Sequence, residues 1–305
     1  MKVAILLCTL HGQHYLEEQL QSVSRQTFSD WEVFASDDGS EDDTRALLLH
    51  YQAMWPHGKL TIHSGPAEGF AANFLSLICN AGIKADYYAF ADQDDVWEPN
   101  KLERAVAWLN TVPKDVPALY GSRTLLVDAN NQVLGLSPLF CKPPCFANAL
   151  MQNIAGGNTM VFNNAARSLL QGAGDKIDVV VHDWWLYLVV SGCGGRVFYD
   201  AHPTVRYRQH DQNAVGLDTG WRARVRRIQL SFNGRFIGWT NRNIAALDRI
   251  TTTLTPENQR KLELLKTARR CWLLPRLWVF WRAGIHRQST LSNIGLFLAA
   301  IFNKI

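Results

Sequence analysis

The residues Asp92 to Asp95 place three carboxylates within four positions, directly after an apolar run that ends at Ala91. Carboxylates at this density repel one another unless a cation lies among them. An Asp-x-Asp pair at the exposed end of a strand can hold Mg²⁺ or Mn²⁺ with few protein ligands, which leaves positions for phosphate oxygens and water. The pattern therefore indicates a metal and diphosphate site. The alternative is a solvated acidic turn before a helix that begins near Pro99.

Two further acidic positions could take part in the same chemistry. Asp37 and Asp38 precede Gly39 in a turn, where they could contact a ligand or cap the following helix. Asp183 stands next to Trp184 and Trp185. An aspartate beside an aromatic pocket is either a helix N-cap or a general base whose pKa has been raised towards the working pH. The sequence leaves both alternatives open.

The first part of the chain alternates apolar runs with helical periodicity. Strands are expected at 3–8, 31–36, 60–63 and 86–91, and helices at 15–23, 45–51, 70–81 and 101–109. This alternation predicts an α/β fold with a parallel, doubly wound sheet, whose ligands bind beyond the carboxyl ends of the strands. Both aspartate-rich turns fall at such ends.

After residue 109 the rhythm changes to short strands and one apolar helix. The strands are expected at 118–127, 132–136, 153–162, 195–200 and 204–209, and the helix at 182–190. Gly156 and Gly157 would permit close approach of the backbone to a ligand.

Charge divides the chain near residue 218. Residues 1–218 carry 15 basic and 24 acidic side chains, whereas 219–305 carry 16 basic and 3 acidic ones. We therefore expect a catalytic domain at 1–218 and a basic, aromatic-rich helical region at 219–305. This region lacks the motifs of nucleic-acid-binding proteins, so no nucleic-acid partner is expected. It could lie in the interface of an anionic membrane, or its helices could pack on the catalytic domain.

Two observations concern the compartment. The six cysteines lack metal-binding spacing and read as reduced thiols of a cytoplasmic protein. The apolar start of the chain is short and is followed by no cleavage pattern, so we interpret it as a first buried strand and not as a signal peptide.

Several motifs in order give the chain a resemblance to the inverting family 2 glycosyltransferases, and to their bacterial rhamnosyltransferase-like branch. The motifs that carry it are 7–9, 34–40, 90–97, 156–162, 182–186 and 207–216. The resemblance implies a GT-A fold, a Rossmann-like nucleotide-binding sheet with flanking helices and an acceptor-side β/α region. Two departures are visible: Leu10-His11-Gly12 replaces a Tyr-Asn-Gly type of turn, and His182 stands where many members carry Glu.

The resemblance also implies roles for individual residues. Asp183 would be the catalytic base. The metal, Mg²⁺ or Mn²⁺, would be bound by Asp92 and Asp94, with His210 as a further ligand or as an ordinary loop histidine. Contacts to the donor are expected from Thr9, Asp37, Asp38, Asp92 and Gln209. Arg206 and Arg208 alternate on a strand and share one face, so they could meet diphosphate oxygens of the donor or face solvent. Trp184 and Trp185 could stack on an acceptor sugar, although one of them is expected in the core.

The function so implied is metal-dependent, inverting transfer of a sugar to a glycan or lipid-linked acceptor in cell-surface polysaccharide synthesis, at the cytoplasmic face of the membrane. The expected donor is dTDP-L-rhamnose, and a UDP-hexose is the alternative. Two other classes use the same features: an Asp- and metal-dependent phosphatase or nucleotidyltransferase, and a membrane scaffold without catalysis.

Overall fold

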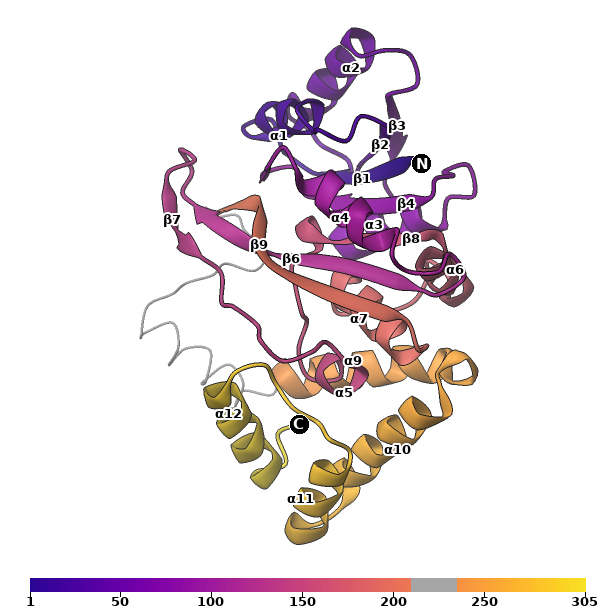
Figure 1. Cartoon of the computed structure of the whole chain (residues 1–305), viewed down its shortest axis with the longest axis vertical. Coiled ribbons are helices and arrows are strands. Elements are labelled where there is room, and N and C mark those ends of the chain that lie inside the picture. The colour runs from indigo at the N-terminus through magenta and orange to yellow at the C-terminus, as the bar shows by residue number, and fades with distance from the viewer. Residues whose placement is uncertain (210–234) are drawn as a thin grey trace.

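The computed structural model describes residues 1–209 and 235–305, and these residues contain one nine-stranded mixed sheet (Figure 1). Eight strands follow the order β3-β2-β1-β4-β8-β6-β9-β5, and β7 pairs with β6. The strands are β1 (Val3–Thr9), β2 (Trp31–Asp37), β3 (Leu60–Ser64), β4 (Tyr87–Ala91), β5 (Val96–Trp97), β6 (Ala118–Val127), β7 (Val133–Leu136), β8 (Val161–Asn163) and β9 (Arg196–Arg208).

The expected run of parallel neighbours is limited to the first four strands, although β6 and β9 are also parallel to each other. Strands β3, β2, β1 and β4 are parallel neighbours, whereas β8 is antiparallel to both β4 and β6. The short β8 joins the parallel half to the pair β6 and β9. The sheet is therefore mixed, and the carboxyl ends of β1, β2 and β4 meet at one edge.

Helices cover both faces of this sheet. The helices of the described residues are α1 (Leu16–Ser24), α2 (Thr44–Met54), α3 (Phe70–Cys79), α4 (Lys101–Leu109), α5 (Phe146–Ala149), α6 (Asn164–Ala173), α7 (His182–Gly192), α9 (Arg235–Arg249), α10 (Pro256–Arg270), α11 (Leu273–Arg282) and α12 (Thr290–Ile301), with 3-10 turns η1 (Gly157–Thr159) and η2 (Thr251–Thr253), and α11 and α12 lie beyond the sheet (Figure 1). Successive residues of β1 point to opposite faces, so Ile5 packs with the α1 and α4 side chains while Leu6 packs with those of α3 and α7. Burial on both faces explains why β1 reads as an uninterrupted apolar run.

Two local expectations differ from the structure. The segment expected as a strand at 153–162 contains η1 and only the short β8. The two strands expected at 195–200 and 204–209 form one strand, β9, whose register against β6 shifts between Ser122 and Thr124. The shift lies opposite the segment that contains Pro203, which has no N–H to give to the ladder.

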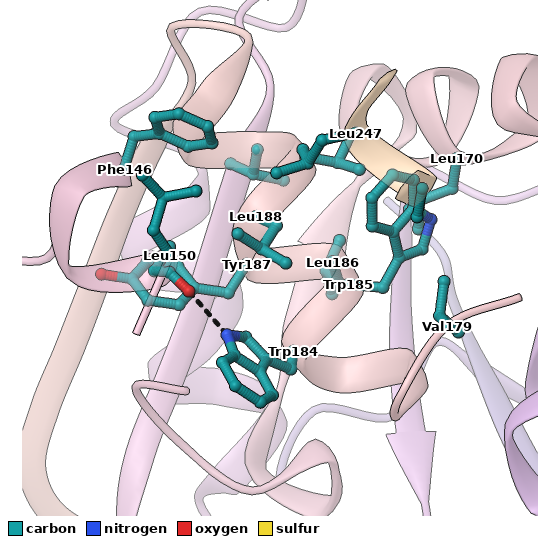
Figure 2. Close-up of a cluster of buried hydrophobic side chains, with 14 of the residues drawn as sticks. Phe146, Leu150, Leu170, Val179, Trp184, Trp185, Leu186, Tyr187, Leu188 and Leu247 are labelled. Carbon is teal, nitrogen blue, oxygen red and sulfur yellow. Dashed lines mark hydrogen bonds between the residues drawn. The ribbon is translucent and has the colours of Figure 1, made fainter. Parts of the chain in front are cut away.

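The helix α7 is buried on every side, and this corrects one expectation about its tryptophans. Figure 2 shows Trp185 beside Leu170 and Val179, while Trp184 points the other way and its indole N–H donates to the Ala149 carbonyl at 2.6 Å. Trp185 is fully buried and Trp184 is 5% exposed. Neither indole face is open to a sugar ring, so both residues belong to the core and not to an acceptor site.

The C-terminal helices share this core. Leu247 and Leu262 are fully buried in the same cluster as Trp185. The Asn258 amide donates to the carbonyls of Ser191 and Gly192, at the end of α7, at 3.1 and 3.0 Å. Packing on the sheet domain, one of the two alternatives for this region, therefore holds for α9 and α10. The expected domain boundary near 218 and the donor or metal candidate His210 lie outside the described residues.

We expect Trp185→Ala to lower the free energy of unfolding by about 3–5 kcal/mol, because it opens a cavity in a fully buried site. Urea unfolding followed by circular dichroism measures this loss. Trp184→Phe is the matched control, since it keeps an aromatic ring and removes the hydrogen bond to Ala149, worth about 0.5–1.5 kcal/mol, with a smaller loss of buried volume. If the Trp185→Ala protein had normal stability and a raised KM for the acceptor, Trp185 would instead be assigned to acceptor binding.

Candidate active site

The acidic turns lie together because their strands are neighbours in register. Thr9 at the end of β1 pairs with Asp37 at the end of β2, and Leu7 pairs with Ala91 at the end of β4. Asp92 follows Ala91 directly. The turn after β2 and the turn after β4 therefore flank the end of β1, at the edge where α/β sheets bind their ligands.

Asp37 holds the first of these turns together. Its carboxylate accepts the hydroxyl of Thr9 at 2.9 Å, and also the hydroxyl and N–H of Ser40 at 2.6 and 3.1 Å. The neighbouring Asp38 accepts the N–H of Ala67 at 2.8 Å, while its own N–H donates to the Thr9 carbonyl. Asp37 thus fixes the loop by bonds within the protein. Asp38 lines the same edge with its carboxylate oriented by the 65–67 segment.

Gln93, between the two aspartates of the metal motif, ties the acidic turn to the loop after β1. Its side-chain amide accepts the N–H of Leu10 and donates to the Leu10 carbonyl, both at 2.8 Å. A Cβ at Gly12 would overlap the Gln93 side chain. A larger residue in the divergent Leu10-His11-Gly12 turn would therefore displace the Gln93 side chain from its two bonds to Leu10.

Asp92 lies within electrostatic reach of two other carboxylates. Burial first, and then the charges of Asp94 and Asp183, raise the pKa of Asp92 to about 8. The charge of Asp92 in turn adds to burial in raising the pKa of the Cys8 thiol. These shifts place Asp92, Asp94 and Asp183 close enough to act on one another, which residue spacing alone could not establish.

Asp95, the third carboxylate of the acidic turn, is bound within the protein. Its fully buried carboxylate accepts the side-chain amide of Asn158 at 2.5 Å and the backbone N–H of Arg208 at 3.2 Å. Burial and the charges of Asp94 and Asp92 raise its pKa well above the usual value. The pair of Asp95 and Asn158 connects the acidic turn to η1. Sequence reasoning missed Asn158, although the Gly-Gly-Asn motif contained it.

Asp183 is held in the first turn of α7 from both sides. One carboxylate oxygen accepts the Gly157 N–H at 2.8 Å, and the other accepts the Trp184 N–H at 2.6 Å. The N-cap position belongs to Val181, so the N-cap alternative for Asp183 is wrong. Burial nevertheless raises the pKa of Asp183 to about 6, against the lowering effect of these hydrogen bonds. Such a carboxylate is suited to general-base catalysis near neutral pH.

Gly157 is required by the approach of η1 to α7. A Cβ there would lie 2.8 Å from the His182 ring and 3.1 Å from the Asp183 Cβ. This close approach allows the Gly157 N–H to reach the Asp183 carboxylate. His182 itself stacks on Phe74 with ring centroids 3.8 Å apart, and burial lowers its pKa to about 3. It is therefore a neutral core residue beside the site.

Arg206 and Arg208, the donor candidates on β9, are engaged within the protein. Arg206 pairs with Glu98 at 2.8 Å. Arg208 has a side chain that is 1% exposed, pairs with Glu18 and donates to the Asp94 carbonyl at 2.9 Å. The expectation that Arg208 contacts the donor is therefore wrong, because its guanidinium is buried beneath the acidic turn and binds that turn. Gln209 continues the strand, its N–H donating to the Val127 carbonyl at 2.8 Å.

Within 1–209 and 235–305 no group of three His, Cys, Asp or Glu side chains is arranged to hold a metal ion. The residues present nevertheless fit a divalent cation, because Asp92 and Asp94 are hard oxygen donors and their mutual repulsion, with that of Asp183, raises the Asp92 pKa. A cation between Asp92 and Asp94 would offset this repulsion and leave positions for phosphate oxygens.

Comparison with known proteins gives both family and fold. The family model for glycosyl transferase family 2 matches residues 4–123. The dTDP-rhamnosyl transferase RfbG of Shigella flexneri is 30% identical over 237 residues, which cover 74% of this chain and 79% of RfbG. The glucosyltransferase WfgD of Escherichia coli, which the full name describes as acting with UDP-Glc on α-D-GlcNAc-diphosphoundecaprenol, is 27% identical over 44% of this chain and 49% of its own.

Solved structures show the same fold at low identity. TarS 1–349 of S. aureus, in complex with UDP-GlcNAc, has a TM-score of 0.54 and 13% identity, covering 94% of this chain and 93% of TarS. The mannosyltransferase PcManGT of Pyrobaculum calidifontis, in complex with GDP-Man and Mn²⁺, has a TM-score of 0.52 and 16% identity, covering 99% and 85%. The expected GT-A fold is confirmed. The mixed sheet with its acidic edge, the matching family model and the similarity to RfbG over most of both chains show that this chain is a glycosyltransferase of family 2.

Proposed function

We propose that the chain transfers a sugar from a nucleoside-diphosphate donor to an acceptor hydroxyl with inversion, and that Asp183 is the base. The observation that carries this proposal is the position of Asp183, a partly buried carboxylate with a pKa of about 6 whose charge acts on Asp92 at the ligand-binding edge. A phosphatase or nucleotidyltransferase that used the same acidic turn would instead release phosphate or pyrophosphate.

In the proposed reaction Asp183 accepts the proton of the acceptor hydroxyl as its oxygen attacks the anomeric carbon. The bond between that carbon and the diphosphate oxygen breaks on the opposite face, so the configuration inverts and the nucleoside diphosphate leaves. The N–H groups of Gly157 and Trp184 keep the carboxylate oriented during attack. Asp92 and Asp94 would hold Mg²⁺ or Mn²⁺, which when bound neutralises the charge of the leaving diphosphate.

For the donor we favour dTDP-L-rhamnose, with Thr9 and Asp38 at the nucleobase. The support is the similarity to RfbG, whose name states a dTDP-rhamnosyl donor. A UDP-hexose is the second candidate, favoured by the UDP-Glc named for WfgD. For the acceptor we favour a lipid-linked glycan at the cytoplasmic face of the membrane, by analogy with the diphosphoundecaprenol in the same name.

Asp183→Asn should keep donor binding and lower the transfer rate by about 10²–10⁴-fold, because the amide takes no proton and its single oxygen can accept only one of the two N–H groups that Asp183 binds. Donor binding is measured by calorimetry with Mn²⁺, and transfer by the nucleoside diphosphate released. Asp175→Asn, which changes an exposed carboxylate between α6 and α7, is the matched control. A normal rate for Asp183→Asn would exclude this residue as the base, and release of inorganic phosphate in place of nucleoside diphosphate would exclude the reaction class.

The rate should also fall in acid through protonation of the base. Since burial raises the pKa of Asp183 to about 6, the active, charged form predominates above that pH and is lost below it. We therefore expect kcat/KM to decrease about tenfold per pH unit in acid. The midpoint should lie at or below pH 6, because a cation at Asp92 and Asp94 favours the charged form. A flat profile down to pH 4 would contradict the assignment.

Asp94→Asn should weaken Mn²⁺ binding by about tenfold or more, because it removes one charged oxygen donor from the pair. The thermal shift produced by Mn²⁺ together with dTDP or UDP reports this binding without turnover. Asp115→Asn, which removes an exposed carboxylate beyond α4, is the control. Full transfer activity in excess EDTA, or an unchanged Mn²⁺ affinity in Asp94→Asn, would contradict the metal site.

A further inference from the structure

The helices α11 and α12 expose large apolar side chains at the end of the molecule away from β3 (Figure 1). We call these residues the apolar surface: Trp272, Leu273, Leu274, Trp278, Trp281, Leu291, Ile294, Phe297, Leu298 and Phe302. Trp281 is 77% exposed and Trp272 is 68% exposed. An exposed group of aromatic and aliphatic side chains of this kind marks an interaction site in a water-soluble domain.

The spacing of these residues makes one face on each helix. Leu274, Trp278 and Trp281 stand at i, i+4 and i+7 of α11. Leu291, Ile294 and Leu298 stand at i, i+3 and i+7 of α12. Each helix therefore presents a continuous apolar stripe to solvent.

The opposite faces of both helices are already occupied. Val279 and Phe280 of α11 and Leu296 of α12 are buried in the core shared with the sheet domain. The buried Arg276 donates to the Ala300 carbonyl at 3.1 Å and so joins the two helices. The buried faces of α11 and α12 thus hold these helices in place. Covering the apolar surface on their exposed faces would need a partner beyond the described residues.

Charge identifies the kind of partner. Residues 264–305 contain seven Lys and Arg and no Asp or Glu. The exposed Arg270 lies just before α11, and the exposed Arg282 has its guanidinium 5.2 Å from the ring centroid of Trp278. Arginines beside tryptophans suit the boundary between phosphate head groups and acyl chains, where the indoles are partly buried and the cations meet phosphate. An anionic lipid surface offers both environments at once.

No described helix has the length and apolar character needed to cross a bilayer. Helices of ten and twelve residues with one apolar stripe fit a position in the plane of the interface. We propose that α11 and α12 bind the interface of an anionic phospholipid bilayer, with Trp278 and Trp281 inserted and Arg270 and Arg282 on lipid phosphates. This deepens the location given under the proposed function, but the binding itself requires neither donor nor acceptor.

The test is flotation of the full chain with vesicles of phosphatidylcholine and phosphatidylglycerol, compared with phosphatidylcholine alone. The double variant Trp278→Ala/Trp281→Ala should lose about tenfold or more in partition to the anionic vesicles, since two exposed indoles are removed. Leu49→Ala/Met54→Ala, two exposed apolar residues of α2, is the matched control and should bind like the unchanged chain. Arg282→Gln should weaken binding to anionic vesicles and leave binding to neutral ones unchanged.

Two outcomes would overturn the proposal. One is equal flotation of the double variant and the unchanged chain. The other is a dimer by light scattering that dissolves in the double variant without any vesicle binding, which would assign the apolar surface to a second copy. Transfer to a water-soluble acceptor is measured in parallel. We expect it to be unchanged in the double variant, so a failure of lipid binding stays distinguishable from a failure of the proposed reaction.

Discussion

The carboxylate of Asp95 is fully buried and those of Asp92 and Asp183 are partly buried at one edge of the sheet, and burial is the first cause of the raised pKa of each. Bringing like charges together in a poorly hydrated place is unfavourable unless each is held by donors or by a cation. The other contacts of the site meet this requirement. Asp95 and Asp183 have protein donors, whereas the pair Asp92 and Asp94 is where a divalent ion would act.

The donors come from segments far apart in sequence, and this explains why the acidic turn needs the second half of the chain. Asn158 of η1 and the backbone of Arg208 on β9 serve Asp95. The Arg208 side chain then holds the Asp94 carbonyl and reaches Glu18 of α1. The motifs of the later region therefore form the frame of the acidic turn, and β8, β9 and η1 fold around it.

Much of this could be predicted from sequence where one segment decides the outcome. The run 3–8 and the aspartates that end β2 and β4 required only local pattern and the rule for parallel strands. The pairing of Asp95 with Asn158 was not predictable, because it joins residues 63 positions apart whose types suit many partners. Trp185 and Arg208 were misplaced for a related reason: residue type shows that an indole or guanidinium can bind a ligand, but only the packing shows that it is buried.

The helix α7 links the two ends of the molecule. Its first turn carries Asp183, which accepts a hydrogen bond from Gly157. At its last residues, the Asn258 amide of α10 donates to the carbonyls of Ser191 and Gly192. The helices that carry the apolar surface pack in the same core as α7. A lipid surface bound at α11 and α12 would therefore have a fixed relation to the base. An acceptor anchored in that surface would then meet Asp183 in a restricted range of positions, which lowers the entropy lost in reaching the reactive geometry.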